Sequence, residues 1–374
     1  MLVELRVLLV RDLALGACPE RRSTIDRFQL HGRSLSQFNL ENLNTDSGIA
    51  GDPATRLWEL WYQQQSADNK FDIKVGQQSI DQEFMVSQYA LSFVNTMFGW
   101  PALPSYDMPA GGPAYPLSAL GGRLRAEPTD QLTLLAGVYD GNPAGTNVGD
   151  PQQADPTGTN FDLNSGILAM AEAQYAINQP TSQVGGVPAG LPGTYKIGAW
   201  YNSNQFADQN LDTLGLSLAD PSTSGIPLEH AGDFSVYGVM DQMIWRPASD
   251  SMQSVGVFAR VMAAPGDRNL VSFSANAGLV VKAPLPGRDN DTFGIGLGYA
   301  QLGSAARAFE QASAPGSPVH TGEAYLEITY QYQVTPWWTL QPDFQYTFDP
   351  INPGNLGQRI GNEAVVGMRT NIVF

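Results

Sequence analysis

Charged and aromatic side chains recur at every second position in several stretches of this chain. Arg123 and Arg125, for example, share one face of a stretch whose other face carries Leu124. A guanidinium is a rigid fork of hydrogen-bond donors and a carboxylate offers only acceptors, so a face that carries both can hold polar groups in fixed positions. By the same alternation, Glu59 and Trp61 are expected on the face opposite Trp58. The candidates for a shared polar face are Glu59, Trp61, Asp72, Lys74, Arg123, Arg125, Phe258, Arg260, Glu327, Asp343 and Arg369.

Few residues of the same sequence have the types and spacing needed for catalysis or metal binding. The three histidines, His31, His230 and His320, are far apart, and only His31 lies near an alternating stretch. A hydrolase nucleophile needs a neighbouring base, most often histidine, so an enzyme is not expected. The acidic run 289–291 lacks the spacing of a calcium-binding EF-hand loop and predicts a solvated turn. We therefore expect no catalytic residues, no metal site and no cofactor.

The elements that would position the polar face are β-strands, because the hydrophobic period is two rather than 3.6. Leu270–Lys282 and the stretch 326–334 alternate most clearly. Segments of about 10 residues are long enough to cross a bilayer when tilted by about 45°. About fourteen such segments are visible. They lie near 26–34, 55–64, 71–77, 117–126, 132–139, 165–175, 194–201, 234–246, 253–263, 270–282, 293–299, 326–334, 340–348 and 366–374.

The composition fits strands in a membrane better than a soluble domain. Charged residues make up 15% of the 374 residues, against about 25% in typical soluble domains. A net charge of −16 leaves no basic stripe for nucleic acid. The sequence therefore predicts an all-β fold, a transmembrane antiparallel β-barrel whose outer face contacts lipid. A soluble β-rich binding protein and an enzyme embedded in the outer membrane are the rival classes.

The connections between these segments alternate between short and long, as in barrels with short periplasmic turns and long outer loops. Residues 202–233 and 303–322 are expected as long loops. The segment 79–116 is exceptional, because it is rich in Phe, Tyr, Trp and Met although it joins two strands. So apolar a loop would not lie in water. We expect it to fold into the barrel as a constriction; packing on a partner subunit is the alternative.

The two ends of the sequence differ in character. Charged residues interrupt the apolar stretch in 1–24, so this region is not expected to be native barrel sequence, and residues 25–374 form the predicted barrel domain. The last strand ends on Phe374, which resembles the terminal aromatic signal that the barrel assembly machinery recognises in outer-membrane proteins.

Several long strings resemble the carbohydrate-selective porins of the OprB family. They include ATRLWELWYQQ at 54–64, DQEF at 81–84, GGPAYP at 111–116, GVYDGNP at 137–143, APGDRN at 264–269 and QPDFQY at 341–346. The resemblance implies a sixteen-stranded barrel with an inward-folded constriction, of which about fourteen strands are visible here. It also implies passive, selective diffusion of small carbohydrates such as glucose into the periplasm of a Gram-negative bacterium. The polar-face residues are then expected to line the pore and to contact the sugar. Many porins are trimers, so a homo-trimer is also considered. A general porin, or one for amino acids, aromatic acids or anions, is the alternative.

Overall fold

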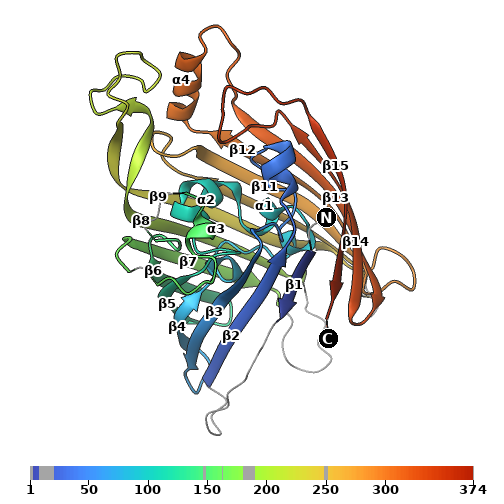
Figure 1. The fold of residues 1–374 in the computed structure, drawn as a ribbon. Coiled ribbons are helices and arrows are strands. Elements are labelled where there is room, and N and C mark those ends of the chain that lie inside the picture. Colours follow the sequence, from blue (N-terminus) through green and yellow to red (C-terminus); the bar gives the residue numbers. More distant parts are fainter. Residues whose placement is uncertain are drawn as a thin grey trace.

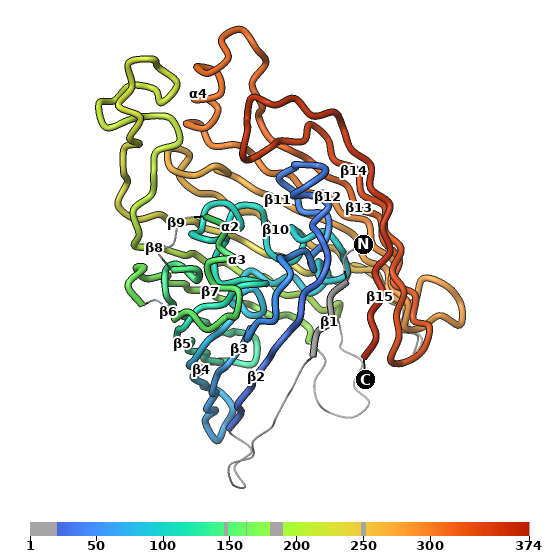
Figure 2. Tube along the Cα trace, viewed as in Figure 1, coloured from blue at the N-terminus to red at the C-terminus, as the bar shows by residue number. Residues whose placement is uncertain are grey.

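In the computed structural model, one antiparallel sheet winds around two short helices, α1 and α2, that lie inside it (Figure 1). The structure describes residues 3–7, 21–145, 149–161, 163–179, 190–247 and 252–373. Within them the sheet has fifteen strands in the order β1 to β15, so that each strand pairs only with its neighbours in the sequence. The tube in Figure 2 shows this order as a continuous progression of colour around the wall.

The strands are β1 (Val3–Val7), β2 (Arg21–His31), β3 (Ala54–Gln65), β4 (Phe71–Gln78), β5 (Ala119–Ala126), β6 (Leu132–Asp140), β7 (Ile167–Ile177), β8 (Gly193–Asp212), β9 (Pro227–Trp245), β10 (Ser254–Ala263), β11 (Val271–Lys282), β12 (Thr292–Leu302), β13 (Gly322–Thr335), β14 (Trp338–Phe348) and β15 (Glu363–Ile372). The helices are η1 (Ser36–Leu40), η2 (Ile80–Gln82), η3 (Ala90–Ser92), α1 (Thr96–Gly99), α2 (Ala102–Asp107), η4 (Pro109–Gly111), α3 (Pro151–Ala154) and α4 (Ser304–Ser313).

The predicted fold class is confirmed, and the fourteen predicted segments correspond to β2 through β15. The long loop predicted at 202–233 is wrong, because β8 and β9 continue to Asp212 and from Pro227. This extension is polar on both faces, so alternation of apolar residues could not reveal it. β1 was not predicted, and it pairs with β2. That residues 1–24 are not native barrel sequence stays a prediction.

The two faces of the wall carry different side chains. Outward positions such as Val75, Ile197, Val236 and Leu297 are exposed and apolar, as expected for a face that contacts lipid. None of the helices in the described part of the chain is long and apolar enough to cross a membrane.

A β-bulge in β3 contradicts the prediction for the direction of the Trp58 side chain. The register with β2 shifts so that Asp26 lies opposite Glu59 while Arg27 lies opposite Leu57. Trp58 is the extra residue, and its side chain is buried inside, with ring centroids 5.8 Å from Phe28 and 6.1 Å from Tyr115. The expectation that Trp58 faces away from Glu59 and Trp61 is therefore wrong, because a bulge locally breaks the two-residue alternation.

Two long connections fold into the barrel. The first, residues 32–53, was not predicted and is here called the first inward segment. The second, residues 79–118, contains the apolar stretch predicted to fold inward and is called the constriction segment. Its buried side chains, such as Phe84, Phe98 and Leu103, form one core cluster with wall residues of β6 to β13. The hydrophobic core of this barrel is thus the contact between a loop and the inner wall.

Glycines of β12 provide the flat surface on which the constriction segment packs. A Cβ atom at Gly296 would lie 2.6 Å from Cζ of Phe98 and 2.9 Å from Cε1 of Phe93. These two rings are stacked with centroids 4.3 Å apart, so neither ring has free space to move into. The repeated glycines of this strand therefore mark the place where a second layer of aromatic residues contacts the wall.

Replacing Gly296 by valine should destabilise this contact by about 1–3 kcal/mol, because the added methyl groups overpack a filled interior. Unfolding in urea, followed by the mobility shift of the unheated barrel on gels, would measure the loss. Gly361→Val is the matched control, since no atom lies within 4 Å of a Cβ atom at that position. Equal midpoints for the two variants would contradict the packing described here.

Candidate permeation site

Carboxylates on the inner wall fix the path of the constriction segment. Each accepts hydrogen bonds from backbone N–H groups of the segment, which otherwise would be buried without acceptors. The acceptor and donor pairs are Glu59 with Ser79 at 3.2 Å, Glu172 with Met85 at 2.8 Å, Asp241 with Gln88 at 2.9 Å, and Glu327 with Val94 at 2.7 Å and Asn95 at 2.9 Å. The segment is therefore held along its length by side chains from β3, β7, β9 and β13.

Arg260 of β10 holds the same segment through its carbonyl groups. Its guanidinium donates to the carbonyl oxygens of Met85 at 2.8 Å, Met97 at 2.8 Å, Phe98 at 2.8 Å and Gly99 at 3.0 Å. Three of these carbonyls end α1, where helical carbonyls have no partner within the helix. Since its side chain is 1% exposed, Arg260 acts as a buried clamp on the segment.

A polar cavity of about 320 Å³ remains between the constriction segment and the wall of β3 to β8, toward the end of the barrel where the turns are short. That volume is at the lower end of the range for small-molecule sites, about 300–1,000 Å³. The lining residues are Gln63, Gln65, Asp72, Gln82, Glu83, Val86, Gln88, Arg123, Arg125, Thr133, Leu135, Gln174 and Lys196. Five of these thirteen residues are glutamines and five are charged, so amide groups and charges share the lining.

The charges at this cavity are mostly paired with one another. Arg123 forms hydrogen-bonded ion pairs with Asp72 of the wall and with Glu83 of the constriction segment. The ammonium of Lys74 lies 2.9 Å from the Glu83 carboxylate and 4.3 Å from the centroid of the Trp61 ring. Burial acts to raise the pKa of Glu83, but Lys74 and Arg123 together hold it below its ordinary value. The network therefore joins the wall to the constriction segment through charge.

Two further cations lie at the cavity. Arg125 forms a hydrogen-bonded ion pair with Glu127 and lies 3.6 Å from Asp72. Lys196 donates to the carbonyl oxygen of Val86 at 2.7 Å, and no ion pair is formed by it in the described part of the chain.

The polar-face candidates from the sequence thus separate into three groups. Asp72, Arg123 and Arg125 line the cavity, and Glu59, Trp61 and Lys74 lie beside it. Phe258, Arg260 and Glu327 contact the constriction segment. Asp343 and Arg369 lie on another part of the wall, where each is bound to a glutamine of β14, Gln345 and Gln341. Their role in contact with a solute stays a prediction.

The prediction from the sequence did not include Lys196 or any of the five glutamines of the cavity. Gln63 shares the parity of Glu59 and Trp61, and Gln174 shares that of Glu172, so alternation could have found both. Gln82 and Gln88 lie on the constriction segment, and only its three-dimensional path brings them to β4 and β8.

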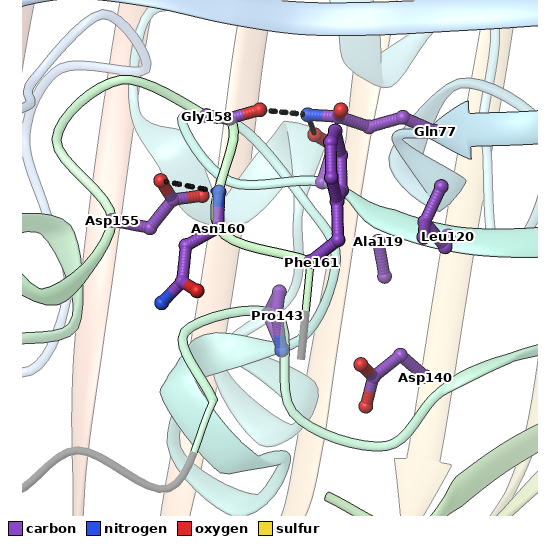
Figure 3. A pocket seen from close by; sticks show the side chains of 10 residues that line it. Gln77, Ala119, Leu120, Asp140, Pro143, Asp155, Gly158, Asn160 and Phe161 are labelled. Carbon is purple, nitrogen blue, oxygen red and sulfur yellow. Dashed lines mark hydrogen bonds between the residues drawn. The ribbon is translucent and has the colours of Figure 1, made fainter. Parts of the chain in front are cut away.

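A second, much smaller pocket lies near the long-loop end of β4 and β5 (Figure 3). Its volume is about 10 Å³, roughly the space of one water molecule. Gln77 donates from one amide nitrogen to Ser118 Oγ at 2.8 Å and to the carbonyl oxygen of Gly158 at 2.9 Å. The residues around this pocket therefore connect two loops to the wall, and the pocket is too small to hold a sugar.

Comparisons with known proteins agree with this architecture. The profile of the carbohydrate-selective porin, OprB family, matches residues 24–374. Porin B of Pseudomonas aeruginosa is 25% identical over 339 residues, which cover 85% of this chain and 68% of that protein. The putative porin QuiX of Acinetobacter baylyi is 23% identical over 316 residues, which cover 79% of this chain and 64% of that protein, so this chain spans about two thirds of both relatives. The high-pH structure of Pseudomonas putida OprB superposes with a TM-score of 0.78 at 20% identity, covering 99% of this chain and 86% of that one.

Proposed function

Because the chain belongs to the carbohydrate-selective porins of the OprB family and is a porin for carbohydrates, we propose that it passes small neutral sugars such as glucose by diffusion across the outer membrane of a Gram-negative bacterium. The observation that carries this proposal is the amide-rich cavity beside the constriction segment. A general porin would instead admit glucose and a neutral amino acid of similar size at equal rates.

The chemistry of the lining suits a neutral, hydroxyl-rich solute. A glutamine amide offers two donors and an acceptor, so it can satisfy a sugar hydroxyl in either role. The paired charges of Arg123, Asp72 and Glu83 provide fixed dipoles without a large net field for an ion. The exposed part of the Trp61 ring can cover the apolar face of a sugar. Each contact is weak enough for release, as conduction requires.

Swelling of liposomes that contain the refolded protein tests the proposal directly. Glucose and a neutral amino acid of similar size would be compared at equal osmolarity, with protein-free liposomes as the blank. Faster entry of glucose is the expected result. Equal rates would leave a general porin and reject selectivity, provided that the mobility shift on boiling shows a folded barrel.

The double variant Gln63→Leu with Gln174→Leu should lower the rate of glucose entry severalfold and leave the amino acid rate nearly unchanged. The reason is that two amides of the cavity would lose their donors and acceptors while the volume stays similar. Liposome swelling measures both rates. Gln311→Leu, on the exposed face of α4, is the control variant that should leave both rates as in the wild type. A parallel fall of both rates in the double variant would indicate a narrowed pore instead of lost recognition.

The proposed partners of the barrel are outer-membrane lipid on its apolar outer face, the barrel assembly machinery through Phe374, and two further copies of the chain in a homo-trimer. Phe374 lies outside the described residues. Chemical cross-linking in detergent that yields only monomers would reject the trimer.

A further inference from the structure

The outward face of β2 carries polar side chains where the neighbouring wall is apolar. In this strand Phe28 and Leu30 are buried inside the barrel. The alternate positions Arg27, Gln29 and His31 therefore point outward, and Arg27 and His31 are exposed. A guanidinium on a lipid-facing position is costly unless its charge is solvated or paired. The outward positions of β3 and β4, in contrast, include the exposed apolar or aromatic residues Leu60, Tyr62, Phe71, Ile73 and Val75.

The length of β2 places this face across the whole apolar band of a membrane. Its 11 residues span about 36 Å along the strand, which is about 25 Å across the membrane at a tilt of about 45°. Arg21 lies opposite Gln64, close to the short turn 66–70 between β3 and β4. Short turns are periplasmic in such barrels, so His31 lies at the outer edge of the band and Arg27 about 9 Å below it.

A third cation follows just beyond the outer end of the strand. Arg33 is exposed, and its guanidinium lies 4.2 Å from the centroid of the Phe38 ring, which is 44% exposed. Exposed aromatic rings and cations are typical of the level of lipid headgroups. Arg27 can reach the same level, because a long arginine side chain extends along apolar surface toward the membrane boundary. Arg27, His31 and Arg33 are called the basic row below.

The basic row is not paired with carboxylates in the described part of the chain, since none of its three side chains forms an ion pair there. Acidic residues are abundant in this chain, with 36 of them against 20 lysines and arginines. Other cations of the wall, such as Arg123 and Lys74, do have carboxylate partners. Unpaired cations on a lipid-facing wall favour an anionic group that the membrane supplies.

We propose that the basic row docks one phosphorylated glycolipid of the lipopolysaccharide class in the outer leaflet of the membrane. This inference rests on the outer-membrane location proposed above, but not on sugar transport. Arginine donates two parallel hydrogen bonds to one phosphate, and an imidazole donates one. Because Arg27 and Arg33 lie on either side of His31, a headgroup with two phosphates fits the row better than a phospholipid with one. The acyl chains would lie on the apolar outward positions of β3 and β4.

Native mass spectrometry of the refolded, lipopolysaccharide-free barrel in detergent tests the proposal, with bisphosphorylated lipid A as the added ligand. Retention of one lipid A per barrel is the expected result, and it should weaken as the ammonium acetate concentration rises. Phosphatidylglycerol, which carries a single phosphate, should bind severalfold more weakly. Equal retention of the two lipids, or no retention of lipid A by a barrel that still shows the mobility shift on boiling, would overturn the proposal.

Variants distinguish the basic row from general attraction of lipid A to positive charge. The double variant Arg27→Gln with Arg33→Gln should lower lipid A affinity about tenfold or more, because two guanidinium contacts with phosphate are lost. Arg21→Gln is the matched control, since Arg21 is exposed at an outward position of the same strand, at its periplasmic end. The control should bind lipid A as the wild type does. An equal loss of affinity in the control would contradict the assignment.

Two further readouts separate this proposal from its alternatives. Dimers of the wild-type protein that disappear in the double variant would assign the basic row to a second copy of the chain, and would reject the lipid. Liposome swelling with glucose should be the same in the double variant and the wild type. Glucose entry without lipid A binding would therefore reject the docking surface alone and leave the proposed function standing.

Discussion

Replacing Arg260 by methionine should raise the single-channel conductance severalfold and abolish the preference for sugars. The substitution keeps much of the side-chain volume but removes every donor to the carbonyls of Met85, Met97, Phe98 and Gly99. Each buried carbonyl left without a donor costs about 1–3 kcal/mol. Only Met97 keeps another donor, from Asn276 at 2.9 Å. The constriction segment can recover this free energy by leaving the wall and exposing its carbonyls to water.

Conductance in planar bilayers and liposome swelling with glucose would measure the change. Arg307→Met is the matched control, because Arg307 belongs to α4, which Figure 1 shows apart from α1 and α2. Wild-type conductance in the Arg260 variant would show that apolar packing alone holds the segment. Retention of the gel mobility shift on boiling would show that the wall itself remains folded.

Replacing Arg123 by glutamine should shift the ion selectivity of the pore strongly toward cations. Asp72 is 1% exposed and would lose its closest cation, while Glu83 would keep only Lys74. Removing one partner of a buried pair costs about 3–5 kcal/mol when the remaining charge cannot be solvated. Here the cavity can admit water and cations, so we expect part of that cost to appear as attraction of cations. The reversal potential in a KCl gradient measures this selectivity.

Arg125→Gln provides the comparison for this experiment. Arg125 is about one third exposed and lies 3.6 Å from Asp72, which would still be paired with Arg123. Its loss should therefore shift the reversal potential much less than the loss of Arg123. Equal shifts in the two variants would mean that net charge, and not the buried network, determines the selectivity.

The strands could be predicted from the sequence because a wall with lipid on one side and polar groups on the other imposes a strict period of two. The prediction failed where a strand does not have one apolar and one polar face in strict alternation. The polar extension of β8 and β9 was mistaken for a loop, and the bulge at Trp58 reversed the facing of one residue. Neither feature changes the composition of the sequence, so alternation alone could not show it.

The site was predicted less completely than the fold, for a physical reason. Alternation selects side chains that point inward, and it found Asp72, Arg123 and Arg125. It cannot tell a side chain that meets solute from one that holds a loop. Arg260 and Glu327 have the same parity and charge as lumen residues, yet they bind backbone groups of the constriction segment. That distinction depends on contacts between residues more than a hundred positions apart.

The strict pairing of each strand with its sequence neighbours has a consequence for the order of assembly. A wall of this kind can grow hairpin by hairpin, because every ladder joins segments that are close in the chain. The attachments of the inward segments cannot: the N–H group of Leu43 meets Glu323 across 280 residues, and that of Val94 meets Glu327 across 233. Until β13 has joined the sheet, the N–H groups of Leu43 and Val94 lack these acceptors, whereas Ser79 can already bond Glu59 of β3. The constriction segment can therefore be attached at its beginning early in assembly, and its full path is fixed only when β13 is in place.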